Sequence, residues 1–259
     1  MPEGDTIHSA ARRVGEALIG REIEAIDTPQ RRHAMDRWPE RLAGRAVRAV
    51  DAHGKHLFIR FEGDLTLHSH LRMTGKWGVY ERGRRWRRSP RRAWLVIRTA
   101  RHDVVEFDGP VLELMTESRT RFDRRLAALG PDVLAAEFDE SRFLARLRQD
   151  DQSRGIADAL LDQRNLAGIG NVWKSEGCFL AGVNPWRPAG EVSDDDALGL
   201  VRGIRAAMQR SVERGGRIES PWVFERTGLP CRRCGTLIRA RGQGDDNRTT
   251  YWCPACQST

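Results

Sequence analysis

The first residues of the chain combine an amine and a carboxylate whose types suit covalent chemistry. Removal of Met1 gives Pro2 a free secondary amine, and Glu3 stands beside it as a proton donor. The pKa of an α-amino group lies near neutrality, so a useful fraction is uncharged at pH 7 and can attack a carbonyl-like carbon to form a Schiff base. Alternatively, Pro2 lies in a frayed terminus and Glu3 is the first acid of a helix, stabilised by the helix dipole. Five residues alone favour this second interpretation.

Four of the five cysteines have metal-ligand spacing. They form two Cys-x2-Cys pairs, Cys231 with Cys234 and Cys253 with Cys256, separated by 18 residues. This spacing predicts a tetrahedral four-thiolate zinc site, which has no open coordination position and is therefore structural rather than catalytic. Two disulfides are the alternative, but nothing else in the sequence indicates an oxidising compartment. Cys178 stands alone in an apolar helical pattern and is expected to be a small buried side chain.

The charge of the chain narrows the choice of partner. Its 259 residues carry 44 Lys and Arg against 36 Asp and Glu, a formal net charge of +8, and the pI is near 9.9. This balance is typical of proteins that bind a polyanion, with nucleic acid the leading candidate. No apolar run approaches the roughly 20 residues that span a bilayer, and residues 1–20 lack the order of a secretory signal. We expect a monomeric cytoplasmic protein, with no membrane partner, that joins the nucleoid when bound to DNA.

The elements that position these groups fall into a β-rich half and a helical half. In residues 4–20 apolar side chains recur on one face and the pattern ends at Gly20, which predicts an amphipathic helix next to the N-terminal pair. Short apolar runs separated by Gly, Pro and Asp follow, and they indicate a sandwich or barrel. The predicted strands are residues 22–26, 46–50, 57–61, 65–71, 94–98 and 104–107.

One segment within the β-rich half is unusually basic. Residues 82–92 contain seven arginines, interrupted by Trp86 and Pro90. The simplest interpretation is a solvated loop, and contact with phosphates is the second.

The helical half begins near residue 119, and we place the domain boundary within residues 126–140. Helical apolar spacing occurs at residues 141–147, 153–161 and 193–214, and Ser193 with Asp196 resembles an N-terminal cap. After it, β-prone residues 236–240 and 249–252 flank the turn-rich residues 242–247 and predict a β-hairpin stapled by the zinc. Arg248 stands at the return of this hairpin. It either meets a phosphate there or is an ordinary surface arginine.

A tight turn between two predicted helices is the most specific segment. Residues 161–176 read LDQRNLAGIGNVWKSE, with Gly168 and Gly170 in the turn. Glycines let backbone approach a ligand closely, and a helix that starts near Asn171 presents unpaired N–H groups to a phosphate. A turn used for packing alone has the same pattern, but a basic chain with a zinc hairpin downstream favours DNA backbone binding.

These segments together resemble the formamidopyrimidine-DNA glycosylase/endonuclease VIII family. The resemblance rests on the initial PEGDT, on Gly54-Lys55-His56-Leu57, on LLDQRNLAGIGNVWKSE and on the terminal RTTYWCPACQ, which occur in family order along the whole chain. It implies a base-excision repair enzyme of the α+β class that acts on damaged DNA. Residues 1–125 are expected to form a catalytic β-sandwich with an N-terminal helix, residues 126–222 a helix-two-turn-helix DNA-binding domain, and residues 223–259 the zinc-finger β-hairpin.

The resemblance also implies roles for single residues. Pro2 becomes the nucleophile that attacks C1′ of the damaged nucleotide, and Glu3 the proton donor and shuttle. Lys55 matches the lysine that assists base loss and contacts a phosphate near the lesion. Asn171 and Arg248 match the family's phosphate-binding pair.

Three further DNA-binding residues follow from the resemblance. Arg164 stands where the family has a basic residue, and Arg72 and Met73 align with the loop that fills the void left by a flipped nucleotide. For Met73 a buried core position is the alternative. The implied reaction needs no dissociable cofactor, because the iminium formed on Pro2 acts as the electron sink for elimination. Zinc is then a structural cofactor, held by the four paired cysteines.

The sequence indicates the type of damaged base less clearly than it indicates the reaction. Oxidised-purine enzymes of the family carry a long glycine-rich loop before the zinc hairpin, and here only residues 215–222 occupy that place. This shortness, PEGDT and the likeness of RARGQGDDNRTTYWCPACQ to the second endonuclease VIII branch of actinobacteria favour a bifunctional glycosylase/AP lyase for oxidised pyrimidines, with β,δ-elimination. However, Leu71-Arg72-Met73-Thr74-Gly75 is closer to the purine branch. The same chemistry on formamidopyrimidine or 8-oxoguanine, and a non-catalytic damaged-DNA-binding protein, therefore stay open.

Overall fold

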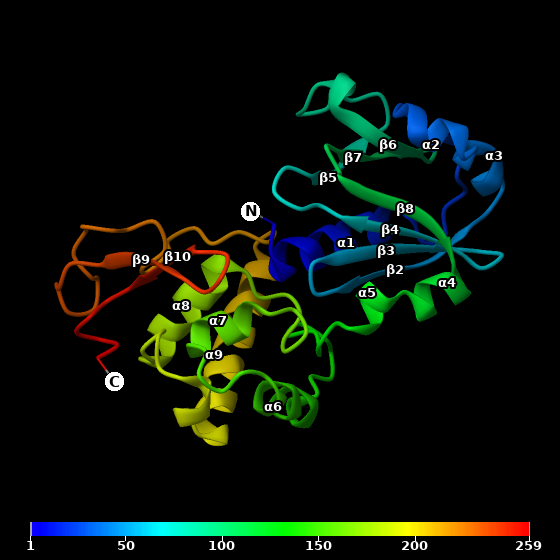
Figure 1. The fold of residues 1–259 in the computed structure, drawn as a ribbon. Helices are drawn as coiled ribbons and strands as arrows, with labels where there is room; N and C mark the ends of the chain where they lie inside the picture. Colours follow the sequence, from blue (N-terminus) through cyan, green and yellow to red (C-terminus); the bar gives the residue numbers. More distant parts are fainter. Residues whose placement is uncertain (1, 259) are drawn as a thin grey trace. The chain divides into compact units, whose positions relative to one another are not determined.

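The chain forms two compact units in the computed structural model, which describes residues 2–258. The first unit contains Pro2 and Thr6–Ala127, and the second contains Glu3–Asp5 and the chain from Ala128 onward. Met1, whose removal the predicted chemistry of Pro2 requires, lies outside the described residues. The combination of sheets, a helical region and a C-terminal hairpin confirms the predicted α+β class (Figure 1).

The first unit contains an N-terminal helix and two antiparallel sheets of four strands. Helix α1 spans Gly4–Leu18. One sheet has the order β1-β6-β7-β5 and the other the order β2-β3-β4-β8. The first sheet consists of β1 (Ala25–Asp27), β5 (Lys76–Glu81), β6 (Ala93–Arg98) and β7 (His102–Phe107). The second sheet consists of β2 (Val47–His53), β3 (His56–Phe61), β4 (Leu65–His70) and β8 (Val111–Thr116).

The core of this unit lies between α1 and the strands. Apolar side chains of α1, such as Val14 and Leu18, pack with alternate residues of β3 and β4, including Ile59 and Leu67. Because side chains alternate across a strand, the residues between them face the other side of the sheet. On β3 and β4 these residues are largely polar, and several of them are histidines.

The sequence predicted six of these eight strands and missed β5 and β8. β5 reads KWGVYE, with charged ends and a glycine in the middle, and both features weaken a strand signal. The bounds of five short helices were not predicted because none has enough residues to show a helical period, although the last two lie where the helical half was expected to begin. They are α2 (Arg31–Met35), α3 (Trp38–Leu42), η1 (Pro90–Arg92), α4 (Glu117–Phe122) and α5 (Arg124–Ala127).

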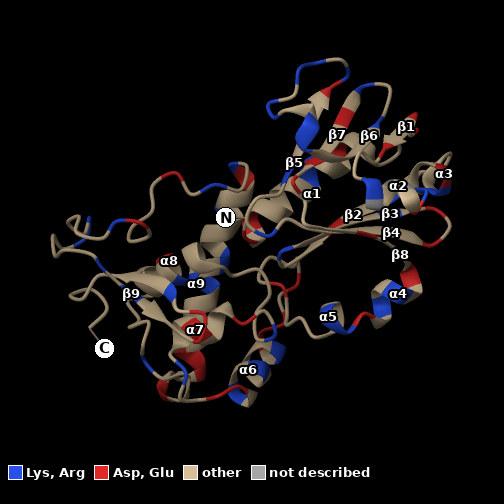
Figure 2. Cartoon of the chain, turned by 45° about the horizontal axis from the view of Figure 1, so that its top comes forward, with Lys and Arg blue, Asp and Glu red and all other residues tan. Residues whose placement is uncertain are grey.

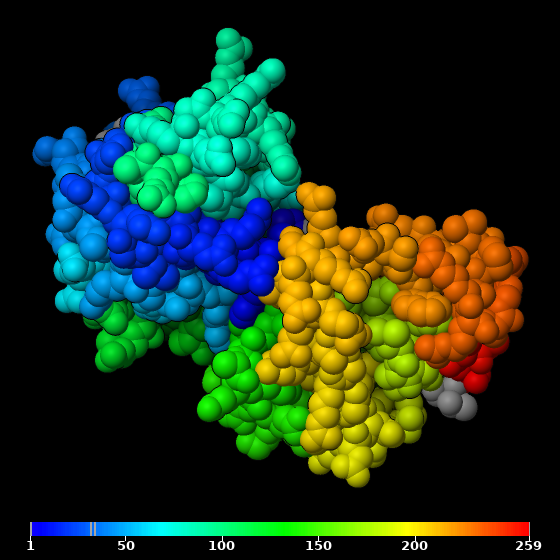
Figure 3. Space-filling view, turned by 180° about the vertical axis from the view of Figure 1, so that it is seen from behind, coloured from blue at the N-terminus to red at the C-terminus, as the bar shows by residue number. Residues whose placement is uncertain are grey.

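The second unit is built on helices with a β-hairpin after them. Its helices are α6 (Glu140–Gln149), α7 (Ile156–Leu161), α8 (Asn171–Ala181), η2 (Ala189–Glu191) and α9 (Asp194–Glu213). The predicted cap of α9 is confirmed, since the Ser193 hydroxyl accepts a hydrogen bond from the Asp196 N–H at 3.1 Å. α9 buries one stripe against α6 and α8 and leaves the opposite stripe at the surface, where it forms the yellow and gold ridge of Figure 3.

The hairpin at the C-terminus is formed by β9 (Arg239–Gln243) and β10 (Arg248–Trp252). The prediction that its first strand spans residues 236–240 was wrong by about three residues. Residues 229–238 instead close a small turn of their own, in which the Cys231 N–H donates to the Thr236 carbonyl at 2.8 Å and the Ile238 N–H to the Leu229 carbonyl at 3.0 Å. Residues 236–238, which β-propensity alone assigned to the strand, therefore belong to the turn around the first cysteine pair.

Candidate functional site

Glu3 is buried in the second unit at the start of α8. Its carboxylate accepts hydrogen bonds from the backbone N–H groups of Gly170 at 3.0 Å, Val172 at 2.8 Å and Trp173 at 3.2 Å. The side chain is 2% exposed. The first N–H groups of a helix have no partner within it, and here no side chain of residue 170 caps them. Glu3 therefore caps α8 from a distant part of the sequence, and its negative charge lies at the positive end of the helix dipole.

The turn before α8 is shaped to receive Glu3. A Cβ atom added to Gly170 would overlap the Glu3 carboxyl group, so glycine is required for this close approach. The Gly4 N–H donates to the Gly168 carbonyl at 2.9 Å, and the Ser211 hydroxyl of α9 donates to the Asp5 carboxylate at 2.6 Å. Residues 3–5 are thus fixed on the second unit by one backbone bond and two carboxylates. The alternative of a frayed terminus does not hold from Glu3 onward.

The two predicted phosphate-binding residues of the second unit lie next to each other. The Asn171 side-chain amide donates to the Thr249 carbonyl at 2.9 Å, and Arg248 is the preceding residue of β10. The Arg248 guanidinium makes an ion pair with Asp246 at 3.2 Å and remains 45% exposed. The side-chain amide of one and the guanidinium of the other are therefore presented by two elements that are bonded to each other. Two such donors can hold one stretch of phosphate backbone.

Lys174, on the same helix as Asn171, was missed by the sequence reasoning. It is 0% exposed, and its Nζ atom has no hydrogen-bond partner among the described residues. Burial lowers the pKa of Lys174 to about 8, while Asp158, Cys178 and Glu3 oppose the fall and Arg248 adds to it. Its place directly after Val172 and Trp173 and one helical turn before Cys178 was the signal that could have found it.

Arg164 has a partner that the sequence did not suggest. Its guanidinium contacts the Asp162 carboxylate through Nε at 3.0 Å and Nη2 at 2.5 Å. This contact is the first cause that lowers the pKa of Asp162 to about 2. Arg164 is exposed, so it stays available to a ligand, but it is not bonded to Asn171 or Arg248.

Lys55 occupies the tip of the β2–β3 hairpin in the first unit. His53 pairs with His56, so Gly54 and Lys55 form a two-residue turn, and Gly54 has φ +58° as the first central position of a type II′ turn requires. Lys55 lies near His70 at the end of β4, where burial, Arg72 and Lys55 lower the pKa of His70 to about 4, in that order. His70 is thus a neutral imidazole beside Lys55 at pH 7, and the sequence reasoning did not select it.

Arg72 and Met73 form the exposed turn after β4. Arg72 has a left-handed φ of +49°, and its N–H donates to the His70 Nδ1 atom at 3.1 Å. Met73 is 68% exposed, so the alternative of a buried core methionine is wrong. A large apolar side chain held out in solvent on a tight turn suits a wedge that enters a base stack.

The four paired cysteines lie together as the spacing predicted. Their sulfur atoms are all within 4.8 Å of one another, and the Cys234 and Cys253 sulfurs are 3.4 Å apart. Four thiolates bound tetrahedrally at about 2.3 Å from a zinc ion have sulfur–sulfur separations of roughly 3.8 Å, so this cluster fits the metal. Cys178 is buried away from them, and burial raises its pKa to about 12, as expected for an inert side chain.

Comparison with known protein families gives consecutive matches along the chain. Residues 1–124 match the formamidopyrimidine-DNA glycosylase N-terminal domain, and residues 129–221 match the H2TH domain of the same enzyme. Residues 228–259 match a zinc finger found in FPG and IleRS. The "Probable endonuclease 8 2" of Streptomyces coelicolor is 45% identical over 268 residues, which cover 100% of this chain and 94% of the relative. The chain belongs to the formamidopyrimidine-DNA glycosylase/endonuclease VIII family.

Other members of this family differ in how closely they match. The "DNA-(apurinic or apyrimidinic site) lyase Nei2" of Mycolicibacterium smegmatis is 39% identical, with 100% of this chain and 99% of the relative covered. A "Formamidopyrimidine-DNA glycosylase" of Burkholderia multivorans is 32% identical over 99% of this chain and 100% of the relative. The fold is shared with Fpg of Lactococcus lactis, solved in complex with DNA containing N7-benzyl-Fapy-dG, with a TM-score of 0.84 at 24% identity and full coverage of both chains.

As a member of this DNA glycosylase and AP lyase family, the chain carries its zinc as a structural cofactor of the finger. The resemblance seen in the sequence and the α+β class are confirmed, as is the zinc prediction. Among the described residues, no helix is both long and apolar enough to cross a membrane.

The arginine-rich segment of this glycosylase is anchored rather than loosely solvated. The Trp86 indole N–H donates to the Asp103 carboxylate at 3.1 Å, and its ring packs near Tyr80 and Phe107. Asp108 forms ion pairs with Arg88 at 2.9 Å and Arg92 at 2.6 Å. Arginines also occur along α4 and α5, at positions 119, 121, 124 and 125, and colour these ribbons partly blue in Figure 2. The expectation of a simple solvated loop was therefore incomplete.

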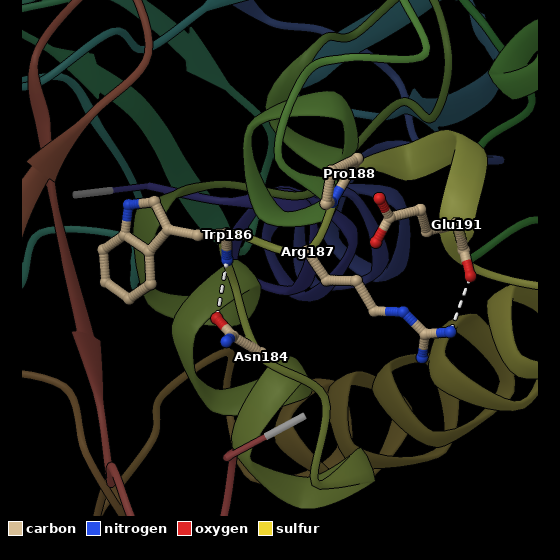
Figure 4. A pocket seen from close by; sticks show the side chains of 5 residues that line it. All are labelled: Asn184, Trp186, Arg187, Pro188 and Glu191. Carbon is tan, nitrogen blue, oxygen red and sulfur yellow. Dashed lines mark hydrogen bonds between the residues drawn. The ribbon is translucent and has the colours of Figure 1, made fainter.

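A surface pocket of about 500 Å³ lies in the second unit, away from the predicted site residues. Its lining side chains are Asn184, Trp186, Arg187, Pro188 and Glu191 (Figure 4). Its polar groups are used internally, since Arg187 donates to the Glu191 carbonyl at 2.6 Å and Asn184 accepts from the Trp186 N–H at 3.0 Å. We assign no chemistry to this pocket.

Proposed function

We propose that this chain is a bifunctional DNA glycosylase/AP lyase for oxidised pyrimidines, working as a monomer through a Schiff base on the Pro2 amine. The observation that carries the proposal is the position of Glu3, whose carboxylate is fixed by three backbone N–H groups directly after Pro2 in the chain. A carboxylate so buried and so firmly held is what a neighbouring amine needs as a proton acceptor and donor. The same proposal places the domain boundaries between residues 125 and 126 and between residues 222 and 223.

The proposed reaction uses Pro2 as the nucleophile and Glu3 as the proton carrier. The Pro2 nitrogen attacks C1′ as the glycosidic bond breaks, and the base departs with the bond's electron pair and a proton. The sugar ring then opens as its oxygen takes a proton, and the nitrogen becomes an iminium. Loss of the C2′ proton sends electrons into the iminium and breaks the C3′–O bond, and a second elimination breaks the C5′–O bond. Glu3 carries protons between these steps.

In this proposal Lys55 is the third catalytic residue, and the remaining residues bind DNA. Lys55 assists base loss and contacts a phosphate near the lesion. Asn171 and Arg248 hold the phosphate backbone, and Arg164 adds a weaker contact at the turn before α8. Arg72 and Met73 enter the gap left by the flipped nucleotide. Unstacking a base costs a few kcal/mol, and an inserted side chain offsets part of it.

The short segment after α9 supports an oxidised pyrimidine as the substrate. α9 ends at Glu213, and the buried Glu176 carboxylate of α8 accepts backbone hydrogen bonds from Trp222, Val223 and Phe224 at 2.8–2.9 Å. Only residues 214–221 lie between these two fixed points, which leaves no long loop to cap a flipped purine. The endonuclease 8 names of relatives at 40% and 45% identity agree with this choice.

A second candidate is the same chemistry on oxidised purines. It is favoured by the segment Leu71-Arg72-Met73-Thr74-Gly75, which resembles the purine branch, and by the 32% identical formamidopyrimidine-DNA glycosylase. Borohydride trapping on DNA duplexes with thymine glycol, dihydrouracil, 8-oxoguanine or an abasic site separates the candidates. We expect the pyrimidine lesions and the abasic site to trap best. Trapping of 8-oxoguanine alone would reverse the assignment, and no adduct on any duplex would leave a non-catalytic DNA-binding protein.

The state of the N-terminus is the control for this experiment. Mass spectrometry must show that Met1 has been removed, because a retained methionine turns the Pro2 nitrogen into an amide without a nucleophilic lone pair. A fusion that keeps residues before Pro2 should bind abasic DNA but form no adduct.

A further inference from the structure

A connected line of polar side chains crosses the outer face of the β2-β3-β4-β8 sheet. Arg125 of α5 donates to the Glu113 carboxylate of β8 at 3.0 Å. The same carboxylate oxygen lies 3.1 Å from the Nδ1 atom of His68 on β4. The Nε2 atom of His68 lies 2.8 Å from the Nδ1 atom of His56 on β3. Three neighbouring strands are thus joined by side-chain hydrogen bonds that end one residue from Lys55.

The partners fix the direction of these hydrogen bonds. A carboxylate accepts, so the Nδ1 atom of His68 carries the proton toward Glu113. The Nε2 atom of a neutral His68 then accepts, and the Nδ1 atom of His56 donates to it. The Nε2 atom of His56 is left with a lone pair. Glu113 therefore sets the tautomer of His68 and, through it, the tautomer of His56.

The surroundings keep these imidazoles uncharged at neutral pH. Burial is the largest cause that lowers the pKa of His56 to about 2, and His70, His68, His53 and Arg125 lower it further. Burial also lowers the pKa of His68, although Glu113 and Asp123 oppose the fall. The charged groups that face the line are Glu113, Asp123 and Arg125 at one end and Lys55 and Arg72 near His70 at the other. The direction of the hydrogen bonds is therefore stable across the physiological range.

The line ends where Lys55 leaves the sheet. His56 is the first residue of β3 and pairs with His53 across the two-residue turn that contains Lys55. The rings of His56 and His70 meet edge to face, with their centroids 4.6 Å apart. The His56 side chain is fixed by its hydrogen bond to His68 and its contact with His70. Because His56 directly follows Lys55, this restricts the backbone conformation of the turn that carries Lys55. The same bonds also bring Lys55 and His70 to one end of the sheet.

We propose that His68 and Glu113 are positioning residues that act through His56 to hold the Lys55 turn in the conformation that base loss requires. The proposal rests on the proposed role of Lys55 and extends it to two residues that do not reach the substrate. A structural role alone would not require this arrangement, because buried polar groups cost free energy and an apolar pair would fill the same space more stably.

The first experiment compares two substitutions of His68 with a control on the same strand face. His68→Phe removes both hydrogen bonds but keeps an aromatic ring against Phe58, which already stacks on His68 at 5.1 Å. His68→Gln keeps an uncharged donor and acceptor that can bridge Glu113 and His56. Thr66→Val changes a buried polar residue two positions earlier on β4 that lies outside the line. Base release from thymine-glycol duplex and borohydride trapping on abasic duplex are measured for each variant under single-turnover conditions.

We expect His68→Phe to slow base release by about 10- to 100-fold, the size of effect that small misplacements of a catalytic group produce. Trapping on abasic DNA, where the base has already gone, should change little. His68→Gln should recover most of the base-release rate, and Thr66→Val should behave as the unchanged protein. If His68→Phe lowers base release and trapping by the same factor, or Gln fails to rescue, the residue is merely structural and the proposal is overturned.

A double-mutant cycle with Lys55→Ala tests the route of the effect. If His68 acts through Lys55, adding His68→Phe to Lys55→Ala should cost no further base-release rate, whereas independent roles give multiplicative losses. Full multiplicativity overturns the positioning role. If Lys55→Ala leaves base release unchanged, the proposed role of Lys55 is wrong. If Lys55→Ala slows base release but His68→Phe does not, only the positioning role of His68 is wrong.

The tautomers can be observed without any activity. Imidazole nitrogen-15 shifts at pH 7 should show protonated Nδ1 atoms on His56 and His68, and a protonated Nε2 atom on His70, whose Nδ1 atom accepts from the Arg72 N–H. Glu113→Gln should allow the reverse tautomer of His68, because an amide can donate. A protonated Nε2 atom on His68 in the unchanged protein contradicts the line.

Discussion

The side-chain amide of Asn171 donates to the carbonyl oxygen of Thr249 at 2.9 Å, so the start of α8 is bonded to the second strand of the zinc hairpin. This bond joins two segments separated by 78 residues and sets Arg248 next to Asn171. It makes the geometry of the proposed phosphate-binding pair depend on the finger. Within the second unit, the zinc cluster is therefore linked through β10 to the start of α8.

Zinc removal should weaken DNA binding. A four-thiolate site folds with its metal, so chelation is expected to unfold β9 and β10 and to release Thr249 from Asn171. Affinity for a duplex with a tetrahydrofuran abasic analogue, measured by fluorescence anisotropy, should fall and should return when zinc is restored. Cys234→Ser should lose the metal, whereas Cys178→Ala should keep it by atomic absorption. A zinc-free protein that binds as tightly as the loaded one contradicts the link.

Replacement of Arg248 should weaken binding to all sequences alike. A phosphate contact releases counterions, so Arg248→Ala is expected to reduce the slope of log affinity against log salt by about one. Arg202→Ala is the matched control, because Arg202 is also an exposed arginine of the second unit, paired with Glu140 at 2.6 Å. An unchanged slope for Arg248→Ala, or an equal loss for both variants, would make Arg248 an ordinary surface residue.

Glu3→Gln should block base release more than it weakens binding or stability. The amide loses the negative charge at the start of α8, which costs about 1 kcal/mol of stability, and it cannot take up the proton that the reaction must move. Pro2→Gly should in turn keep DNA binding and slow Schiff-base formation. Single-turnover base release, borohydride trapping and binding to abasic DNA are compared for both variants.

Glu176→Gln provides a close control for Glu3→Gln. Like Glu3, Glu176 is 2% exposed and accepts three backbone hydrogen bonds. Its loss should lower stability by a similar amount and leave base release from a folded sample unchanged. If the two variants slow base release equally, Glu3 acts as a helix cap and not as a proton carrier.

The features predicted correctly from the sequence were those that depend on residues close together in the chain. The cysteine spacing gave the zinc cluster, the Ser193 cap gave the start of α9, and the alternating runs gave six strands. Each depends on residues within one turn, strand or knuckle. The prediction was wrong where another local structure uses the same residues. The turn that contains Cys231 includes residues 236–238, so the first strand of the hairpin begins later than β-propensity predicted.

The partners of the site residues were beyond sequence reasoning from the residues alone. Glu3 bonds to residues about 170 positions later in the chain, and no local pattern shows which helix a terminal acid will cap. The burial of Lys174 and the line from Glu113 to His56 depend on strand register and helix packing. Alternation of Thr66 and His68 with Leu65 and Leu67 marks one face of β4 as polar, but it does not show what that face contacts.

Lys174 should make stability depend on pH above neutrality. Its pKa falls from 10.5 to about 8 on folding because of burial, which corresponds to a penalty on the order of 3 kcal/mol at pH 7, where both folded and unfolded forms are charged. Between pH 8 and 10.5 the folded form has lost its proton and the unfolded form still binds it, so stability rises with pH over this window. Lys174→Met should therefore stabilise the protein at pH 7 and lose this advantage progressively toward pH 10. Urea unfolding followed by tryptophan fluorescence with zinc present measures the difference between Lys174→Met and the unchanged protein. A constant difference between Lys174→Met and the unchanged protein from pH 7 to 10 would mean that Lys174 keeps its proton in the folded state over this whole range, as a hydrated or paired ammonium does.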